Sequence, residues 1–365
     1  MHSKYKNLFV CPECSSKLDM VVFDSEGCII IDGLFTCRDN NHFYPIINGI
    51  PRFLTLEMID RVLDKNVFSE YVEKYATRLP RTLVERKSDQ DRRDHTSNIQ
   101  ASVAGIYSYL WEKYNTDFDS SDQAEFMRLT GGLLTFNEFK NQSVIDVGSG
   151  QGRHITPALA AGVKEIVCVD LGNHISLAHE KHKENTKVLC VQADVYNLPL
   201  MADFDLVMNI GVLHHLPDPA KGFDQLVKLA KKGGLIFAWC YGDSTLKKAI
   251  LLLRRIVNAL PAKVIWFVSG IITIPRYFVS WAGKKLRELG FQDLADMLPM
   301  SVYENYHFHY LHTNTFDHLA TKIINFFKKE DIEMWLANSH INDFKIIERF
   351  PNSVATSWVI IAKKD

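Results

Sequence analysis

The stretch 144-VIDVGSGQGRHI-155 decides the fold of this chain. It begins as an apolar, β-branched run typical of a buried strand, reaches Asp146, and then places Gly148, Gly150 and Gly152 at alternate positions. Glycine permits a positive φ and lets a ligand approach the backbone closely. A helix that begins after such a loop points its N-terminus at the ligand. The stretch therefore predicts a strand, a ligand-binding loop and a helix.

The order of residues in the loop restricts the ligand. A dinucleotide-binding loop has the form GxGxxG, whereas this loop has the form GxGxG and is preceded by Asp146. A carboxylate next to the loop would repel a pyrophosphate and suits a cationic or zwitterionic ligand better. The GK[ST] sequence of a phosphate-binding P-loop is also absent.

Two further acids stand at the ends of the next apolar runs. Asp170 follows Asp146 by 24 residues, and Asp194 ends the run after that. A carboxylate at the second position can accept both hydroxyls of a ribose, and the next acid is suited to an adenine amino group. Each acid alone could equally be a helix N-cap. Three acids at successive strand ends, together with the glycine loop, favour an adenosine-containing ligand.

Strand-like and helix-length segments alternate from residue 142 onward. Strands that alternate with helices predict βαβ crossovers and a parallel, doubly wound sheet. Two more runs, 342–350 and 354–364, are joined by only 351-PNS-353, so they must be antiparallel. The predicted parallel strands are 143-SVIDV-147, 165-EIVCVD-170, 187-KVLCVQ-192, 203-DFDLVMNI-210 and 234-GLIFAWC-240.

In combination these segments resemble the class I S-adenosylmethionine-dependent methyltransferases, over roughly residues 98–242 and 329–364. The resemblance implies an α/β, Rossmann-like sheet of seven strands in the order 3-2-1-4-5-7-6, with the last strand antiparallel. It also implies an aromatic segment, 107-YSYLWEKYN-115, that closes over the cofactor. The matching segments are 144-VIDVGSGQGRH-154, 167-VCVDLG-172, 193-ADVYNLPL-200, 204-FDLVMNIGVLHHLPDP-219 and 232-KGGLIFAW-239.

The resemblance also implies roles for individual residues around S-adenosylmethionine. Asp146 and the glycines would hold the methionine part, Asp170 the ribose, and Asp194 with Val195 the adenine. Asn209, Ile210 and His214 would line the floor beside the reacting methyl group. The full implied cofactor set is Asp146, Gly148, Ser149, Gly150, Gly152, Asp170, Leu171, Asp194, Val195, Asn209, Ile210 and Trp111.

His214 and His215 are the candidate catalytic residues. A methyl sulfonium is already reactive, so the protein mainly aligns the displacement and removes a proton where the acceptor needs it. A histidine can titrate near neutral pH and serve as that base. The HH-L-x-D/E-P pattern also occurs in this family whatever the substrate, so a structural role for both is the alternative. Weaker candidates lie in or beside the segment 243–328, and these are Tyr241, Asp243, Tyr306, His307 and His309.

The N-terminal cysteines have metal-binding spacing. Cys11 and Cys14 form a CxxC pair, and Cys37 and His42 follow as a second pair, which can complete a tetrahedral, structural zinc site. Residues 1–54 resemble the zinc ribbons at the N-terminus of some methyltransferases, and 43-FYPIINGIPRFL-54 resembles the Trm112-like family. Cys28 is an alternative ligand, and a metal-free remnant with buried thiols is the alternative interpretation.

The segment 243–328 interrupts the alternation of strands and helices. Its part 249–286 is strongly apolar, yet Pro261 and Pro275 are expected to break it, and its longest uncharged run is shorter than the roughly 20 residues of a membrane span. We therefore predict helices and no transmembrane span. These helices would pack on the core, cover a greasy substrate or contact a membrane surface peripherally.

Four regions follow from these patterns. The chain has 365 residues with 47% hydrophobic and 23% charged residues, as in globular proteins with a core. We assign residues 1–54 to the zinc ribbon, 55–140 to a helical linker and cofactor lid, 141–242 with 329–365 to the methyltransferase core, and 243–328 to a substrate-binding insert.

The net charge and the composition of the insert indicate which of three possible functions to expect first. The formal net charge of −1 gives no overall attraction to nucleic acid, and the apolar insert favours a small-molecule or lipid-like methyl acceptor. RNA methylation with the zinc ribbon as an RNA-binding element is the second hypothesis, and a non-catalytic, cofactor-binding partner subunit is the third. Reduced core cysteines and an N-terminus without a signal-like apolar segment predict a cytoplasmic protein.

Overall fold

The computed structural model describes residues 1–85, 95–113, 126, 129–201, 203–243, 247–298, 303–350 and 356–365. The charged run at 86–94, the end of the predicted aromatic segment at 114–115 and the predicted connection at 351–353 lie outside the described residues.

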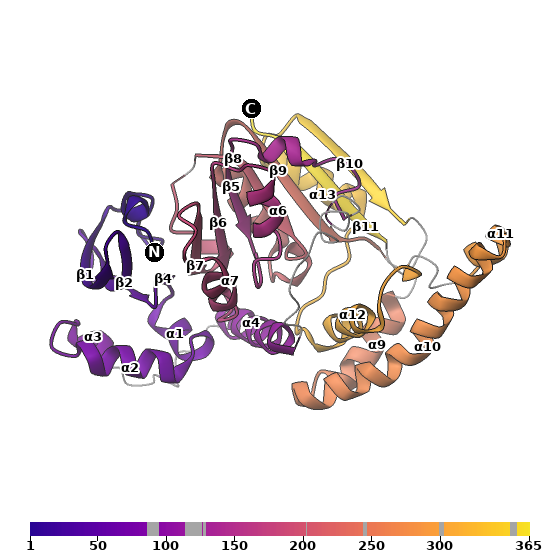
Figure 1. Cartoon of the computed structure of the whole chain (residues 1–365), viewed down its shortest axis with the longest axis horizontal. Coiled ribbons are helices and arrows are strands. Elements are labelled where there is room, and N and C mark those ends of the chain that lie inside the picture. Colours follow the sequence, from indigo (N-terminus) through magenta and orange to yellow (C-terminus); the bar gives the residue numbers. More distant parts are fainter. Residues whose placement is uncertain are drawn as a thin grey trace.

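Seven strands form the predicted core sheet. Their order is β7-β6-β5-β8-β9-β11-β10, which is the predicted order 3-2-1-4-5-7-6 (Figure 1). Strand β11 is antiparallel to both β9 and β10, as expected from the short connection before it. The strands are β5 (Ser143–Val147), β6 (Glu165–Asp170), β7 (Val188–Ala193), β8 (Phe204–Ile210), β9 (Ala230–Tyr241), β10 (Asp343–Arg349) and β11 (Ser357–Lys363).

Helices cover both faces of this sheet. Successive side chains of a strand point to opposite faces, so Val144 packs with α6 (Ile155–Ala160) and α7 (Ile175–His182). Its neighbour Ile145 shares a core with α8 (Pro219–Leu229) and α13 (Lys329–Asn338). Two apolar cores thereby fix the sheet, and the carboxyl ends of its parallel strands meet at one edge.

The N-terminal module continues the same sheet. Its strands are β1 (Leu18–Glu26), β2 (Ile29–Cys37), β3 (Phe43–Ile47) and β4 (Ile50–Phe53). Strand β4 pairs in parallel with β7, so the sheet has eleven strands. The prediction of seven strands with a separate small unit was therefore wrong in its count. The reason is physical: β7 would otherwise be an exposed edge with unpaired backbone groups, and β4 covers it.

Short helices pack against this module. The predicted helical stretch 57–78 is divided into α1 (Leu56–Val62) and α2 (Lys65–Tyr75), followed by α3 (Arg81–Val84). Asp64 begins α2 as its N-cap, since its carboxylate accepts the N–H groups of Asn66 and Val67 at 2.9 and 3.2 Å. These helices share an apolar core with the strands of the module.

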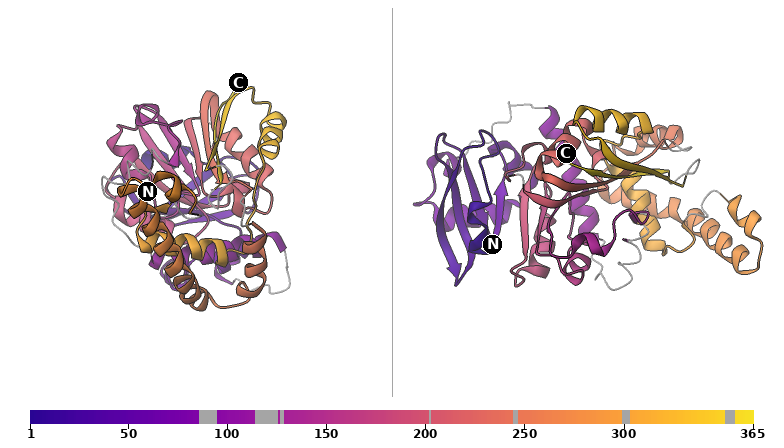
Figure 2. Two further views of the ribbon diagram at one scale, coloured as in Figure 1. Left: turned by 90° about the vertical axis from the view of Figure 1, so that its right-hand side faces the viewer. Right: turned by 90° about the horizontal axis from the view of Figure 1, so that it is seen from above.

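The described residues of the insert, 243, 247–298 and 303–328, form four helices at the end of the molecule opposite the N-terminal module (Figure 2). They are α9 (Lys247–Val257), α10 (Ala262–Glu288), α11 (Gln292–Asp296) and α12 (Phe308–Ala320). Helix α4 (His95–Lys113), from the predicted lid region, contacts α12.

Pro275 lies inside α10, so the prediction that it breaks the helix was wrong. Proline removes only one helical hydrogen bond, and packing of α10 against α12 on both sides of Pro275 holds the helix together. By length and composition alone, α10 is apolar enough to cross a membrane.

Arg52 joins the N-terminal module to the core. It is buried in β4 opposite Gln192 of β7, and its guanidinium donates to Gln192 Oε1 at 2.5 Å. It also donates to Asn173 Oδ1 at 3.3 Å and to Ser176 Oγ at 3.4 Å. Burial lowers the pKa of Arg52 to about 10, which leaves it charged at neutral pH. A buried charge of this kind is tolerated only when it is hydrogen-bonded.

Replacing Arg52 with methionine tests this junction. Arg52→Met keeps much of the volume but removes the partner of the buried Gln192 and of the half-buried Asn173 and Ser176. We therefore expect the free energy of unfolding in urea to fall by about 2–4 kcal/mol. Arg38→Met is the matched control, because Arg38 pairs with Asp19 at the exposed surface of the same module and should leave stability nearly unchanged. Equal stability of the two variants would contradict the role of Arg52.

Candidate functional site

A cavity of about 360 Å³ lies at the carboxyl ends of the parallel strands. The ends of β5, β6, β7 and β8 form one side, and α4 and α12 form the other. In an open parallel sheet this edge is where ligands bind, at the point where the strand order reverses. The volume lies within the range of small-molecule sites.

The glycine loop after β5 exposes its backbone to the cavity. Gly148 has φ +81°, and a Cβ added there would come within 2.1 Å of Val212 Cγ2. The Gly148 N–H donates to the carbonyl of Val169 at 2.7 Å, which holds the loop to β6. At Gly150 an added Cβ would lie 3.2 Å from the indole nitrogen of Trp111. Only glycine fits both positions, and Trp111 of α4 lies against the loop.

Asp170 connects the second strand to the same loop. One carboxylate oxygen accepts the Gly150 N–H at 2.9 Å, and the other accepts the Gly172 N–H at 2.8 Å. His174 Nε2 lies 3.0 Å from the latter oxygen. Burial alone would raise the pKa of Asp170, but the His174 charge and these hydrogen bonds outweigh it and lower the pKa. The cavity therefore has a fixed carboxylate beside the glycine loop.

Asp194 is both an N-cap and a cavity residue. Its Oδ1 accepts the Tyr196 N–H at 3.1 Å, and it begins the short helix η3 (Val195–Asn197). Gln100 of α4 donates to the same oxygen at 2.8 Å. Burial raises the pKa of Asp194. The capping role and the cavity-lining role are thus compatible at this position.

Three of the residues predicted to contact the cofactor do not line the cavity. Asp146 is buried with one oxygen 2.9 Å from His154 Nδ1. Asn209 donates to the Val147 carbonyl at 2.8 Å, and Gly152 packs against Ile155. These three residues lie behind the residues that line the cavity and hold them in position. The predicted residues that do line the cavity are Gly148, Ser149, Gly150, Asp170, Leu171, Asp194, Val195, Ile210, Trp111, His214 and His215.

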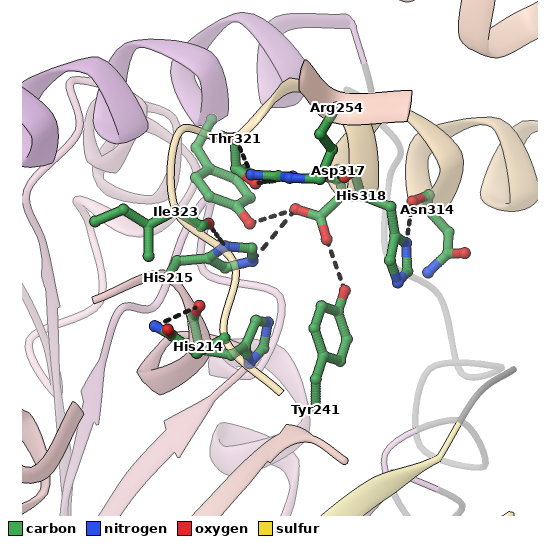
Figure 3. A network of polar contacts seen from close by, with 11 residues as sticks. His214, His215, Tyr241, Arg254, Asn314, Asp317, His318, Thr321 and Ile323 are labelled. Carbon is green, nitrogen blue, oxygen red and sulfur yellow. Dashed lines mark hydrogen bonds and ion pairs between the residues drawn. The ribbon is translucent and has the colours of Figure 1, made fainter. Parts of the chain in front are cut away.

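A largely buried carboxylate from the insert, that of Asp317, lines the same cavity as the glycine loop. Figure 3 shows its polar contacts. Asp317 of α12 accepts hydrogen bonds from the phenol groups of Tyr107 and Tyr241, the latter at 2.6 Å. His215 Nε2 lies 3.5 Å from Asp317 Oδ1. The three partners come from α4, the end of β9 and the short helix η4 (Leu213–His215). The network thus joins the lid, the core and the insert.

The charge on Asp317 is held in place by its neighbours. Burial alone would raise its pKa, but the His215 charge, the contact with His215 and the hydrogen bond from Tyr107 hold the pKa well below the usual range. His215 Nδ1 faces the carbonyl of Ile323 at 2.9 Å and therefore carries a proton. The Nε2 contact with Asp317 is attractive when that nitrogen is protonated as well. Among the described residues, His215 Nδ1 thus has a hydrogen-bond partner, whereas Nε2 has only the 3.5 Å contact with Asp317.

His214 differs from its neighbour. It is buried, it lines the cavity, and its Nδ1 has no hydrogen-bond partner among the described residues. Burial and the nearby charge of His215 lower its pKa well below the ordinary value, so the ring is neutral. Its ring stacks on Tyr241 with centroids 3.7 Å apart. This is the arrangement of a neutral imidazole that can accept a proton or a hydrogen bond from a ligand.

Arg254 of α9 anchors α12. Its buried guanidinium donates to the carbonyl of His318 at 2.5 Å and to the carbonyl and hydroxyl of Thr321. These acceptors lie at the C-terminal end of α12, where carbonyl groups lack helical partners. Arg254 therefore fixes the helix that carries Asp317.

Asp317, Tyr107 and Arg254 were not predicted as site residues. The signal that could have identified Asp317 is its isolation, since no other acid occurs in 305–329, a segment rich in histidine and aromatic residues. Of the weaker candidates, Tyr241 and Tyr306 line the cavity, whereas Asp243, His307 and His309 do not.

The N-terminal cysteines and histidine converge as predicted. The ligand atoms of Cys11, Cys14, Cys37 and His42 lie within 4.8 Å of one another. Cys11 Sγ is 3.3 Å from His42 Nδ1, and Cys14 Sγ is 3.4 Å from Cys37 Sγ. Tetrahedral zinc with bonds of about 2.3 Å holds its sulfurs about 3.8 Å apart, so the group fits the ion. Cys28, the alternative ligand, lies outside this group.

Comparison with known proteins gives a partial match. The methyltransferase domain family matches residues 145–238. A tRNA U34 carboxymethyltransferase of Shewanella sp. (strain ANA-3) is 33% identical over 99 residues, which are 26% of this chain and 30% of the relative. A ubiquinone biosynthesis O-methyltransferase of Colwellia psychrerythraea is 32% identical over 123 residues, 33% of this chain and 48% of the relative. The chain thus spans less than half the length of these curated relatives.

Among solved structures, magnesium protoporphyrin IX methyltransferase from Synechocystis PCC 6803 with bound SAH aligns over 74% of this chain and all of its own. Its TM-score is 0.46 and its identity 12%. The family match and the strand order around β5 agree with each other. Residues 145–238 therefore form a domain that matches the methyltransferase domain family.

Proposed function

We propose that this chain transfers the methyl group of S-adenosylmethionine to a small, apolar or lipid-like acceptor. One observation carries the proposal: a single cavity runs from the glycine loop and Asp170 to His214 and the aromatic wall of the insert. The first end fits an adenosyl ligand and the second fits an apolar acceptor. Both ligands would share one enclosed space, as a direct transfer between them requires.

The end formed by the core fits the cofactor. A Cβ at Gly148 or Gly150 would fill the space that the backbone leaves open. Asp170 would accept from the ribose, with Asp194 and Val195 at the adenine and Trp111 over the loop. When bound, S-adenosylmethionine supplies an activated methyl group on a sulfonium centre.

The end formed by the insert fits the acceptor. Aromatic side chains dominate this wall, with Asn314, Asp317 and His318 among them. His214 is the group that we propose accepts a proton from the acceptor, because it is neutral and its Nδ1 is free among the described residues. Asp317 and His215 hold each other and Tyr241 in position. The aromatic residues of this wall are Tyr241, Tyr303, Tyr306, Tyr310 and Phe326.

RNA is the second candidate acceptor. Two observations support an RNA acceptor. One is the similarity to a tRNA U34 carboxymethyltransferase, and the other is the group of three cysteines and one histidine in the N-terminal module. Bulk charge does not favour it, because Lys and Arg number 42 against 43 acidic residues. The experiments below separate these two acceptors and also the third hypothesis, a non-catalytic partner subunit.

We also propose that Cys11, Cys14, Cys37 and His42 hold a structural zinc ion. The set supplies four protein ligands, which leaves no open position for catalysis. Glu13 Oε2 lies 3.5 Å from His42 Nε2, while His42 Nδ1 faces the sulfur cluster. A carboxylate on the second ring nitrogen is a common way to orient a zinc-bound histidine.

Calorimetric titration with S-adenosylmethionine tests the cofactor end. Asp170→Ala should weaken binding about tenfold or more, because a buried carboxylate and the loop that it holds are lost together. Asp224→Ala is the control, since Asp224 pairs with Lys228 at the exposed surface of α8. Absence of binding by the wild type, or equal affinity of the Asp170→Ala variant, would refute the site.

Transfer of a labelled methyl group to a cell extract, sorted into lipid, small-molecule and RNA pools, tests the acceptor. We expect label in the lipid or small-molecule pool, and a rate at least ~100-fold lower for His214→Gln, which removes the proton acceptor. His340→Gln makes the same change at an exposed position outside the cavity wall and should keep the wild-type rate. Label in RNA alone would support the second candidate, and no label in any pool would support the third.

Metal analysis of the purified protein tests the zinc group. Cys14→Ser removes one thiolate and should lose bound zinc, whereas Cys28→Ser should retain one ion per chain because Cys28 lies outside the group. Equal zinc content in the two variants, or a wild type without zinc, would be inconsistent with the proposed ligands.

A further inference from the structure

The insert helices α9 and α10 present large apolar side chains to solvent. In α10 these residues recur at intervals of three and four, so they form one stripe along the helix. Phe267 is 69% exposed and Phe278 is 60% exposed. We call the stripe and its continuation on α9 the outer face, and its residues are Leu252, Ile256, Phe267, Ile271, Ile274, Phe278 and Trp281.

The opposite side of α10 already has a partner. Ser269, Thr273 and Ser280 are buried, and Thr273 Oγ1 lies 2.9 Å from Thr315 Oγ1 of α12. Arg276 donates to Asn314 Oδ1 at 3.1 Å and also bonds Thr315. The side of α10 that faces the protein thus combines these polar residues with Ile265 and Trp266, which pack near Phe316 of α12. The aromatic residues Phe267, Phe278 and Trp281 face outward instead, so α10 is apolar on both sides.

The charge of this region identifies the partner. Between residues 244 and 287 the chain has nine Lys and Arg residues and no Asp or Glu, although the whole chain has a net charge of −1. Lys248, Arg255, Lys263 and Lys284 are exposed on the two helices that carry the outer face. Apolar side chains flanked by cations match a surface of acyl chains and anionic headgroups.

We propose that the outer face docks α9 and α10 in the plane of an anionic membrane surface. A spanning orientation of α10 would surround its inner side with lipid and strip Arg276 and Thr273 from α12, which is costly for a buried cation. Docking by one face keeps these contacts. The helices lie at the end of the molecule far from the N-terminal module, so the sheet would remain in water (Figures 1 and 2).

Docking would also place the cavity near the lipid, and this part rests on the proposed function. Helix α12 lies between α10 and the cavity. Its Thr315 contacts Thr273 of α10, whereas its Tyr310, Asn314 and Asp317 line the cavity. An acceptor that resides in the bilayer would then reach the site from the surface to which the insert is bound. The docking itself does not depend on catalysis.

Vesicle flotation of the full chain tests the docking. Vesicles of equal parts phosphatidylcholine and phosphatidylglycerol should bind the protein, and pure phosphatidylcholine vesicles should bind it more weakly. The double variant Phe267→Asp with Phe278→Asp should bind the vesicles with an affinity lower by about tenfold or more, because two apolar side chains are replaced by charged ones. The variant Lys263→Glu with Lys284→Glu should lose the preference for anionic vesicles.

Matched controls keep the result specific. Met334→Asp with Phe344→Asp changes two exposed apolar residues, 54% and 41% exposed, outside the insert and should bind like the wild type. Affinity for S-adenosylmethionine should be unchanged in the Phe267 and Phe278 variant, so failure of docking and failure of the methyltransferase proposal are distinguishable. High-salt or alkaline washing should release a docked protein.

Four outcomes would overturn the proposal. The first is no binding to either vesicle, and the second is equal binding by the Phe267 and Phe278 variant. The third is a dimer in solution that the same variant dissolves, because a second copy would then be the partner of the outer face. Resistance of the bound protein to alkaline extraction would indicate a spanning helix and would equally refute docking in the plane.

Discussion

The candidate site depends on the hydrogen bonds that Asp170 forms with the glycine loop. Its carboxylate receives the Gly150 and Gly172 amides, while the Gly148 amide is tied to Val169 of the same strand. These bonds hold two strand ends together and turn the backbone toward the cavity. A charge that is buried yet satisfied by fixed donors is pre-organised for a ligand, since little rearrangement is needed on binding.

A second buried carboxylate fixes the other half of the cavity. Asp317 contacts Tyr107, His215 and Tyr241, which come from three parts of the chain. Arg254 anchors α12, the helix that carries Asp317. Backbone hydrogen bonds add to this network, since the Asn325 N–H donates to the His214 carbonyl and the Phe327 N–H to the Tyr241 carbonyl. His214 stays neutral next to this charged group because it is deeply buried and faces the charge of His215. The acceptor end is therefore built by the insert and the core together.

Local sequence was sufficient for the strands and for the residues at their ends. Apolar runs predicted β5 to β11, and the acids that follow β6 and β7 line the cavity as expected. Long-range contacts were not predictable. Arg52 bonds Gln192 at a separation of 140 residues, and Tyr107 bonds Asp317 at a separation of 210. No local pattern encodes such pairs, so the eleven-stranded sheet and the Asp317 network emerged only from the structure.

The central claim is that one cavity receives both the cofactor and the acceptor. A crystal structure of the protein with S-adenosylhomocysteine tests this most directly. The account predicts ligand density between the glycine loop and Asp170, with the sulfur facing the space bounded by His214 and Tyr241. Density outside this cavity, or a ligand whose sulfur faces away from the insert, would contradict it.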